Sequence, residues 1–216
     1  MSDNPKSSNK FVTVLIIALL GVAGYVFYKN FDIAAPIEAT QDTATTSGIH
    51  PACETPVAPD GVKTVNLELE LASGKVLLEL RPDLAPNHVE RISSLAAEGF
   101  YDGIVFHRVI DGFMAQTGDP TGTGMGGSEL PDLDAEFTET PYQCGTLGMA
   151  RSQDPNSANS QFFITFQDAR FLDNQYTVFG FVREGMDLVH KIKKGEGQSG
   201  TVTDPDKIVA LKVLDH

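Results

Sequence analysis

The alternation of apolar and polar residues just after position 63 is the feature that most limits the possible folds. Residues 64–71 read TVNLELEL, so every second residue is apolar. Successive side chains of a strand point to opposite faces, and the alternation therefore predicts a strand with one buried face. Ser73-Gly74 then predicts a turn, and residues 75–80 predict the second arm of a β-hairpin.

Further short segments downstream predict more strands and two helices. Pro86 suits the first turn of a helix because its φ is fixed, and apolar residues at helical spacing continue the pattern to Gly99. A second helix is predicted over residues 186–193. Strands are predicted over residues 105–110, 113–116, 146–150, 162–165, 178–182 and 208–214. With 20 Gly and 12 Pro residues to make turns, the pattern predicts a mostly β protein over residues 62–216, a closed antiparallel barrel capped by helices.

Residues 11–28 form an uncharged apolar run, FVTVLIIALLGVAGYVFY. As a helix this run would span roughly 27 Å, close to the thickness of the bilayer hydrocarbon. A buried core helix is one alternative, but it would show polar residues at helical spacing. A cleaved signal peptide is the other, although its apolar region is usually only about 7–15 residues long. We expect an uncleaved transmembrane signal-anchor helix that precedes the β domain.

The charges around this run predict its orientation. Lys6 and Lys10 precede it, whereas acidic residues dominate the segment after Lys29. Positive charges favour the cytoplasmic side, so residues 1–10 are expected to form a cytoplasmic tail and the C-terminal domain to be exported. The predicted location is the inner (cytoplasmic) membrane, crossed once, with the domain in the periplasm if the source is a bacterium. Residues 29–61 are rich in Ala, Thr, Pro, Ser and Gly, which predicts a flexible linker.

The two cysteines, Cys53 and Cys144, leave two alternatives open. In an exported domain they can pair, and a disulfide that closes a loop of this length is worth about 4–5 kcal/mol in the chain-entropy model. Alternatively, Cys144 is a small buried apolar residue and Cys53 is a free thiol.

Charge and motif spacing exclude several classes of function. The net charge of −13 argues against a nucleic-acid partner. The five histidines lack metal-ligand spacing and no C-x-x-C is present, so no metal site is expected. Residues 122–127 fit G-x-G-x-x-G, but Pro131 disfavours the helix that a dinucleotide site needs, so a tight loop is expected. His107 is expected to be structural, because neighbours in a strand face opposite ways and Arg108 stands beside it.

Residues 106–119, FHRVIDGFMAQTGD, carry the strongest chemical signal. Arg108 is a permanent cation among apolar residues, and it can donate hydrogen bonds and charge but cannot act as a base. Such a site suits a reaction that needs polarisation and shape without a nucleophile. The alternative is a strand whose single arginine points to water.

Six short motifs follow one another between residues 65 and 214. They are GFYDG at 99–103, FHRVI at 106–110, FMAQ at 113–116, GDP at 118–120, SQFFI at 160–164 and VFG at 178–180. In this combination the chain resembles the cyclophilins, which are peptidyl-prolyl cis-trans isomerases. The resemblance implies an eight-stranded antiparallel barrel with two capping helices and a proline-binding groove on its outer surface. It also implies catalysis without cofactor, metal or covalent intermediate, on proline-containing polypeptide segments, by a monomeric soluble domain.

The resemblance assigns roles to individual residues. Arg108 matches the catalytic arginine of the family. Gln116 and Gln161 match the positions that orient the substrate backbone, while Ala150 and Arg151 match the segment whose main chain pairs with the peptide. The apolar pocket for the proline ring is matched by Phe113, Met114, Phe163 and Leu172.

Two further substrate-binding positions depart from the usual pattern. Phe171 stands where a Trp is usual, and Tyr176 where a His is usual. The indole N–H donor is lost, so the resemblance does not extend to cyclosporin affinity.

The expected function is the isomerisation of X-Pro bonds in exported or periplasmic proteins, which assists their folding. The alternative is a non-catalytic, membrane-tethered chaperone or scaffold that binds proline-containing peptides. A small-molecule carrier is a weaker alternative, because a small barrel fills its interior with side chains.

Overall fold

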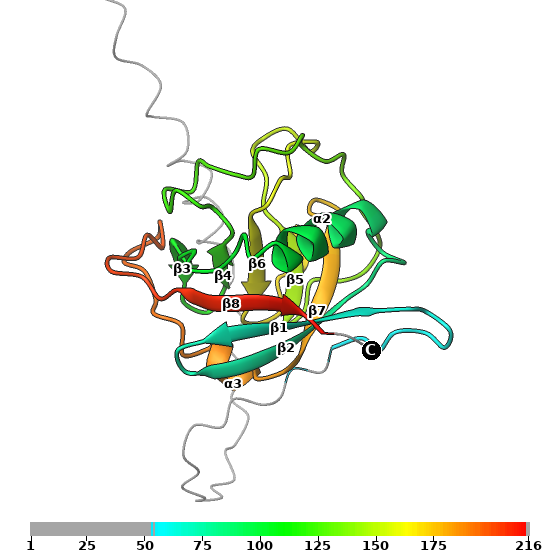
Figure 1. Cartoon of the computed structure of the whole chain (residues 1–216), viewed down its shortest axis with the longest axis horizontal. Helices are drawn as coiled ribbons and strands as arrows, with labels where there is room; N and C mark the ends of the chain where they lie inside the picture. The colour runs from blue at the N-terminus through cyan, green and yellow to red at the C-terminus, as the bar shows by residue number, and fades with distance from the viewer. Residues whose placement is uncertain (1–52, 54, 215–216) are drawn as a thin grey trace, which may run out of the picture. The chain divides into compact units, whose positions relative to one another are not determined.

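The computed structural model describes residue 53 and residues 55–214. Within them, eight strands form one curled antiparallel sheet in the order β3-β4-β6-β5-β7-β2-β1-β8 (Figure 1). The strands are β1 (Val65–Leu71), β2 (Gly74–Leu80), β3 (Arg108–Ile110), β4 (Met114–Thr117), β5 (Thr146–Met149), β6 (Phe162–Thr165), β7 (Val178–Glu184) and β8 (Ile208–Val213). The mostly β, eight-stranded antiparallel architecture expected from the sequence is confirmed.

The hairpin of β1 and β2 follows the predicted alternation. Val65 pairs with Leu80 at one end, and Leu71 pairs with Gly74 at the turn. Gly74 has a φ of 139°, which side chains rarely tolerate, and so lets the chain reverse at once. The alternate residues are buried, namely Leu67, Leu69, Leu71, Val76, Leu78 and Leu80.

β3 is shorter than predicted because the residues before it pair elsewhere. A strand was expected from residue 105, but β3 begins at Arg108. Val105 instead forms an isolated antiparallel bridge with Lys207, and the Phe106 amide donates to the Asp206 carbonyl at 2.9 Å. These bonds connect the β3 edge of the sheet with the segment that leads into β8.

The helix α2 (Pro86–Ala97) lies against β8, β1 and β7 and ends two residues before the predicted end (Figure 1). Its N-terminus is capped from a distant loop. Glu136 accepts hydrogen bonds from the amides of Asn87 at 3.3 Å and His88 at 3.1 Å, and it contacts Nδ1 of His88 at 2.6 Å. A carboxylate is favourable there because the first amides of a helix have no internal acceptors.

The second helix, α3 (Met186–Val189), is much shorter than the segment predicted over residues 186–193. After His190, whose amide still donates to the Met186 carbonyl, the amides of Lys191 and Ile192 donate to carbonyls three residues back rather than four. The Lys193 amide then donates to the Asp206 carboxylate at 2.8 Å. We infer that this capture ends the helix, and the local periodicity does not reveal it because Asp206 lies in another segment.

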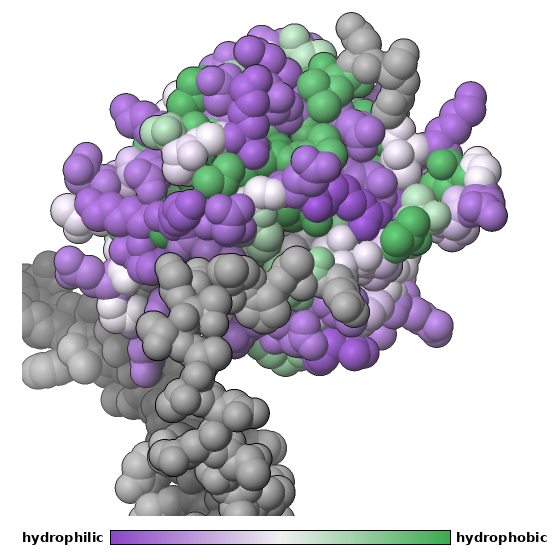
Figure 2. Space-filling view, turned by 90° about the horizontal axis from the view of Figure 1, so that it is seen from below, coloured by the Kyte–Doolittle hydropathy of each residue, from purple (hydrophilic) through white to green (hydrophobic). Residues whose placement is uncertain are grey.

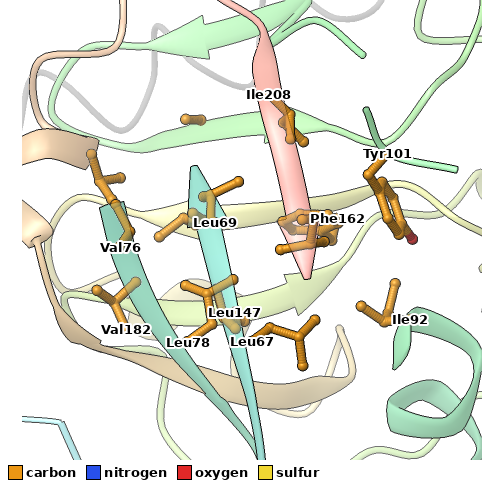
Figure 3. Close-up of a cluster of buried hydrophobic side chains, with 14 of the residues drawn as sticks. Leu67, Leu69, Val76, Leu78, Ile92, Tyr101, Leu147, Phe162, Val182 and Ile208 are labelled. Carbon is orange, nitrogen blue, oxygen red and sulfur yellow. The ribbon is translucent and has the colours of Figure 1, made fainter. Parts of the chain in front are cut away.

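Apolar side chains from the sheet and from α2 fill the interior of the curl. Figure 3 shows Leu67, Leu69, Leu147 and Phe162 together with Ile92 of α2, and each of these side chains is at most 1% exposed. A packed interior of this kind disfavours the carrier alternative. The face in Figure 2 is mostly hydrophilic, with hydrophobic residues gathered in a few patches.

No helix within residues 53 and 55–214 has the length and apolar character needed to span a bilayer. The predicted anchor at residues 11–28 and the tail before it lie outside the described residues.

Cys53 and Cys144 form a disulfide, with their Cα atoms 5.3 Å apart, so the free-thiol alternative is wrong. Arg183 binds the chain just after Cys53. It donates to Oγ1 of Thr55 at 2.8 Å and to the Pro56 carbonyl at 2.7 Å. The end of the predicted linker over residues 29–61 is therefore attached to the β domain.

Candidate active site

Three neighbouring strands place three predicted site residues in one row. Arg108 of β3 pairs with Gln116 of β4, and Gln116 pairs with Phe163 of β6. Directly paired residues point to the same face of a sheet, and their neighbours along each strand point to the other face. Those neighbours, Val109, Ala115 and Ile164, are fully buried in the core. Arg108, Gln116 and Phe163 therefore point to the outer face.

A cavity of about 370 Å³ lies over this row. It is lined by Arg108, Phe113, Met114, Gln116, Ala150, Arg151, Phe163, Phe171, Leu172, Gln175 and Tyr176. All predicted site residues except Gln161 are in this set. The structure thus brings together side chains from β3, β4, β6 and the segments after β5 and β6.

The apolar wall of this cavity is a cluster separate from the main core. Met114, Phe163 and Leu172 are the buried members of this cluster that line the cavity, and Leu172 comes from the short 3-10 helix η1 (Arg170–Leu172). Phe171, also in η1, is 64% exposed and lies against Phe113 with ring centroids 5.3 Å apart. Phe171 stands where a Trp is usual, and it still provides an aromatic side chain at the rim of the cavity.

The Phe163 ring is held in place by residues on its side away from the cavity. Tyr142 stacks on it, with ring centroids 5.8 Å apart and planes inclined by 19°. Gly148 of β5 leaves the room that the ring occupies, because a Cβ at this position would lie 2.4 Å from Cζ of Phe163. The shape of the apolar wall therefore depends on residues that do not line the cavity.

Arg108 lies at the polar side of the cavity and is held by neutral acceptors. Its Nε donates to the Ser199 carbonyl at 3.0 Å, and its Nη1 donates to Oε1 of Gln116 at 3.3 Å. Within the described part of the chain, no carboxylate lies within ion-pair distance of Arg108. The positive charge is thus available to a ligand beside the apolar wall.

The Arg151 side chain is held by main-chain carbonyls and by an aromatic ring. Its guanidinium donates to the carbonyls of Ser152, Gln153 and Gln175 and lies 4.5 Å from the centroid of the Tyr176 ring. This side chain fixes the loop after β5 against the segment after η1. The main chain of Ala150 and Arg151 was predicted to pair with the peptide, and this stays a prediction; the Ala150 amide donates to the Gln161 carbonyl at 2.9 Å.

Gln161 lies in a second cavity, of about 540 Å³, next to the first. The two cavities share Gln116, Ala150 and Arg151. The second is further lined by the glycine-rich loop Gly124–Gly127 and by polar residues, which are Ser128, Asp132, Ser152, Ser157 and Asn159. The predicted groove thus corresponds to two adjacent cavities, the first with an apolar wall and the second lined by polar side chains together with the glycine-rich loop.

Asp119 anchors the glycine-rich loop from below. It is fully buried, and its carboxylate accepts from the amide and hydroxyl of Thr121, both at 2.8 Å, and from the amide of Gly124 at 2.6 Å. Burial alone would raise the pKa of Asp119, but these hydrogen bonds lower it to about 2. Gly122 and Gly124 have positive φ and no helix follows them, which confirms the tight loop expected in place of a dinucleotide site.

The lowered pKa of Asp119 predicts an acid-dependent loss of stability. A carboxyl whose pKa is lower in the folded than in the unfolded chain contributes stability above about pH 4, and loses that contribution as the pH falls towards 2. We expect Asp119→Asn to be less stable than the wild type by about 1–3 kcal/mol at pH 7, and this difference to shrink between pH 4 and pH 2. Urea unfolding of both proteins at these pH values measures it, and a difference that stays constant with pH contradicts it.

Two further predictions concern His107, which was expected to be structural, and the absence of a metal site. His107 lines neither cavity, and burial lowers its pKa, which keeps the ring neutral at pH 7 and fits the expected structural role. Among the residues that the structure describes, Cys53, Cys144 and His190 have potential ligand atoms within 4.8 Å of one another. The two sulfurs are joined in the disulfide, so they do not offer thiolates.

Comparison with known families decides the identity of this domain. The family model described as "Cyclophilin type peptidyl-prolyl cis-trans isomerase/CLD" matches residues 64–213. The chain belongs to this family. It is a cyclophilin-type peptidyl-prolyl cis-trans isomerase, as the order of the motifs implied.

Relatives of this cyclophilin come from bacteria and eukaryotes. A probable peptidyl-prolyl cis-trans isomerase of Brucella suis is 56% identical over 174 residues, which cover 75% of this chain and 88% of the relative. The isomerase ppi1 of Schizosaccharomyces pombe is 41% identical over 153 residues, covering 69% and 96% of the two chains.

Solved structures share the fold of this cyclophilin. A Cryptosporidium parvum cyclophilin superimposes with a TM-score of 0.65 at 28% identity, covering 71% of this chain and 99% of that one. A structure of that protein determined in the presence of the dipeptide Ala-Pro gives a TM-score of 0.64 at 30% identity, with 70% and 99% covered.

Sequence reasoning missed some contributors to the site. Gln175 lines the first cavity beside Tyr176, and the Ser199 carbonyl holds Arg108. A backbone carbonyl has no signature in the sequence, so Ser199 could not have been found from residue types. Gln175 has no distinguishing pattern either, since it stands in an exposed turn.

Proposed function

We propose that this cyclophilin catalyses rotation about X-Pro bonds of exported polypeptides, with Arg108 as the catalytic residue. The observation that carries the proposal is an arginine that has no carboxylate partner among the described residues and lies beside the apolar wall of a cavity of about 370 Å³. Rotation about a peptide bond faces a barrier of roughly 18–20 kcal/mol because its resonance must be broken. In the twisted transition state the imide nitrogen becomes pyramidal and regains a lone pair.

Arg108 stabilises the twisted state more than either planar state. A donor near the imide nitrogen or the adjacent carbonyl binds where charge develops during rotation, and the guanidinium is always charged and held by the Ser199 carbonyl. The apolar wall around Phe113, Met114 and Phe163 holds the proline ring while the rest of the peptide rotates. Residues that flank the proline lie in the second cavity, next to Gln116 and Arg151. The reaction needs neither a nucleophile nor a proton transfer.

The same proposal places the enzyme on the outer side of the inner membrane, anchored by residues 11–28. The uncharged apolar run, the lysines before it and the acidic residues after it support this orientation. The disulfide between Cys53 and Cys144 is a second line of support, because disulfides persist in oxidising compartments and are rare in the cytosol. The substrates are then the exported chains that fold in that compartment.

Protease accessibility tests the proposed location. In spheroplasts that carry the full chain with a C-terminal epitope tag, we expect the tag to sediment with membranes and to be removed by external protease without detergent. A cytoplasmic marker protein in the same spheroplasts has to stay intact as a control. A tag that stays protected until detergent is added, or a chain that remains in the soluble fraction, contradicts the anchored and exported arrangement.

A further inference from the structure

A continuous series of hydrogen bonds connects the glycine-rich loop with Arg108 through Gln161 and Gln116. Nε2 of Gln161 donates to the carbonyls of Gly124 at 3.1 Å and Gly126 at 2.8 Å. Oε1 of Gln161 accepts from Nε2 of Gln116 at 2.9 Å, and Oε1 of Gln116 accepts from Nη1 of Arg108 at 3.3 Å. Each amide donates towards the loop and accepts from the side of Arg108, so rotating either amide by 180° would place donor against donor or acceptor against acceptor.

This series changes the role that the two glutamines can have. The sequence suggested that Gln116 and Gln161 orient the substrate backbone. In the structure, Nε2 and Oε1 of each glutamine already form hydrogen bonds within the protein. Their first effect is therefore on the position of Arg108 relative to the loop.

The glycine-rich loop is held on its inner side by Asp119 and is exposed to solvent on its outer side. Asp119 holds the loop amides from inside, and a Cβ at Gly126 would lie 2.2 Å from Oδ1 of Asp119, so the loop backbone packs directly on this carboxylate. Met125 stands between the two glycines whose carbonyls Gln161 binds, is 90% exposed and lines the second cavity. A ligand in the second cavity therefore contacts the same loop that orients Gln161.

We propose that the glycine-rich loop Gly122–Gly127 positions the Arg108 guanidinium through Gln161 and Gln116, so that peptide residues in the second cavity raise kcat for isomerisation. The proposal rests on the proposed catalytic role of Arg108. Binding energy from parts of a substrate remote from the reacting bond accelerates the reaction when it is used to orient the catalytic group. Gln161 and Gln116 are then positioning residues, and their loss lowers kcat rather than only raising KM.

The experiment compares two peptides and three variants of the full chain. One peptide is a blocked Ala-Pro dipeptide, and the other is a blocked hexapeptide with proline at its centre, which reaches beyond the first cavity on both sides. The variants are Gln161→Met, Gln116→Met and the double variant, in which an unbranched apolar side chain replaces each amide. Asp132→Asn is a matched control, because Asp132 lines the second cavity and its carboxylate accepts a hydrogen bond from Nδ2 of Asn159, which is outside the series. Saturation kinetics from NMR cis/trans exchange give kcat and KM separately.

We expect the wild type to turn over the hexapeptide with a kcat about tenfold higher than the dipeptide, and each Gln→Met variant to lose most of this gain. The double variant is expected to be no slower than the slower single variant, because either change alone breaks the same series. Asp132→Asn should keep the gain and change only KM. The side-chain Nε–H resonance of Arg108 gives a readout without catalysis, since it should shift with the hexapeptide in the wild type but not in Gln161→Met.

Several results would overturn the proposal. They are an unchanged kcat with a raised KM in Gln161→Met, additive losses in the double variant, or an Arg108 resonance that responds to the hexapeptide without Gln161. Backbone amide spectra of each variant show whether the fold is retained, and Gln116→Met provides a second test that leaves the bonds between Gln161 and the loop in place. If Arg108→Ala is inactive while Gln161→Met keeps the gain, only the coupling fails. If Arg108→Ala is fully active, the proposed catalytic role itself fails.

Discussion

Replacing Arg108 with alanine is expected to lower kcat/KM for prolyl isomerisation by about 100-fold or more while the protein stays folded. The guanidinium binds two neutral oxygens, the Ser199 carbonyl and Oε1 of Gln116, both of which water can reach once the side chain is gone. We therefore expect the free energy of unfolding to change by no more than about 1 kcal/mol. NMR exchange on an Ala-Pro peptide measures the rate, and urea unfolding measures the stability.

Arg108→Lys is the matched control that separates the effect of the positive charge from that of the guanidinium geometry. Lysine keeps the positive charge but loses the planar fork that reaches the Ser199 carbonyl and Gln116 together, so we expect an intermediate rate. Near-native turnover by Arg108→Ala would contradict the catalytic role. Peptide binding with no faster exchange, even in the wild type, would instead support the binding-module alternative for this chain.

Removal of the disulfide between Cys53 and Cys144 is expected to lower the free energy of unfolding by about 4 kcal/mol. The bond joins residues 91 positions apart, and a crosslink over such a distance restricts the unfolded chain strongly. Cys53→Ala is the cleaner variant, because Sγ of Cys144 also contacts the Phe166 carbonyl at 3.0 Å. Urea unfolding of Ser47–His216, which forms a compact unit of its own, measures the effect.

The reduced wild type is the control for this change. With a reductant present, the wild type should unfold at the same urea concentration as Cys53→Ala, and the variant itself should not respond to the reductant. Isomerase activity in the absence of urea should be retained by all forms, because neither cysteine lines the first or the second cavity. A wild type whose stability is independent of reductant would contradict the expected contribution of the disulfide.

The sequence predicted those parts of the molecule that depend on local patterns. The alternation after residue 63 located the hairpin of β1 and β2, and the order of the motifs located the residues around the first cavity. The errors arose where distant residues decide the local structure. Asp206 captures the Lys193 amide and shortens α3, and Lys207 pairs with Val105 ahead of β3.

Site details were missed for the same reason. The hydrogen bond from the Ala150 amide to the Gln161 carbonyl joins two separate segments and has no signature in the residue types. The glycine-rich loop is held over the buried Asp119 carboxylate by hydrogen bonds from Thr121 and Gly124, which residue types do not specify. The residues of the site could thus be found from motifs, but their hydrogen-bond partners could not.

Because Arg108, Gln116 and Phe163 form one row, the activity of this enzyme depends on the correct register of its own strands. The three residues reach the outer face only because β3, β4 and β6 are paired in one particular register. If β4 slipped by one residue, Ala115 would take the outward position and Gln116 would enter the core. A misaligned chain would therefore lose catalysis and core packing together, so a folding helper that carries this site is active only after its own strands have paired correctly.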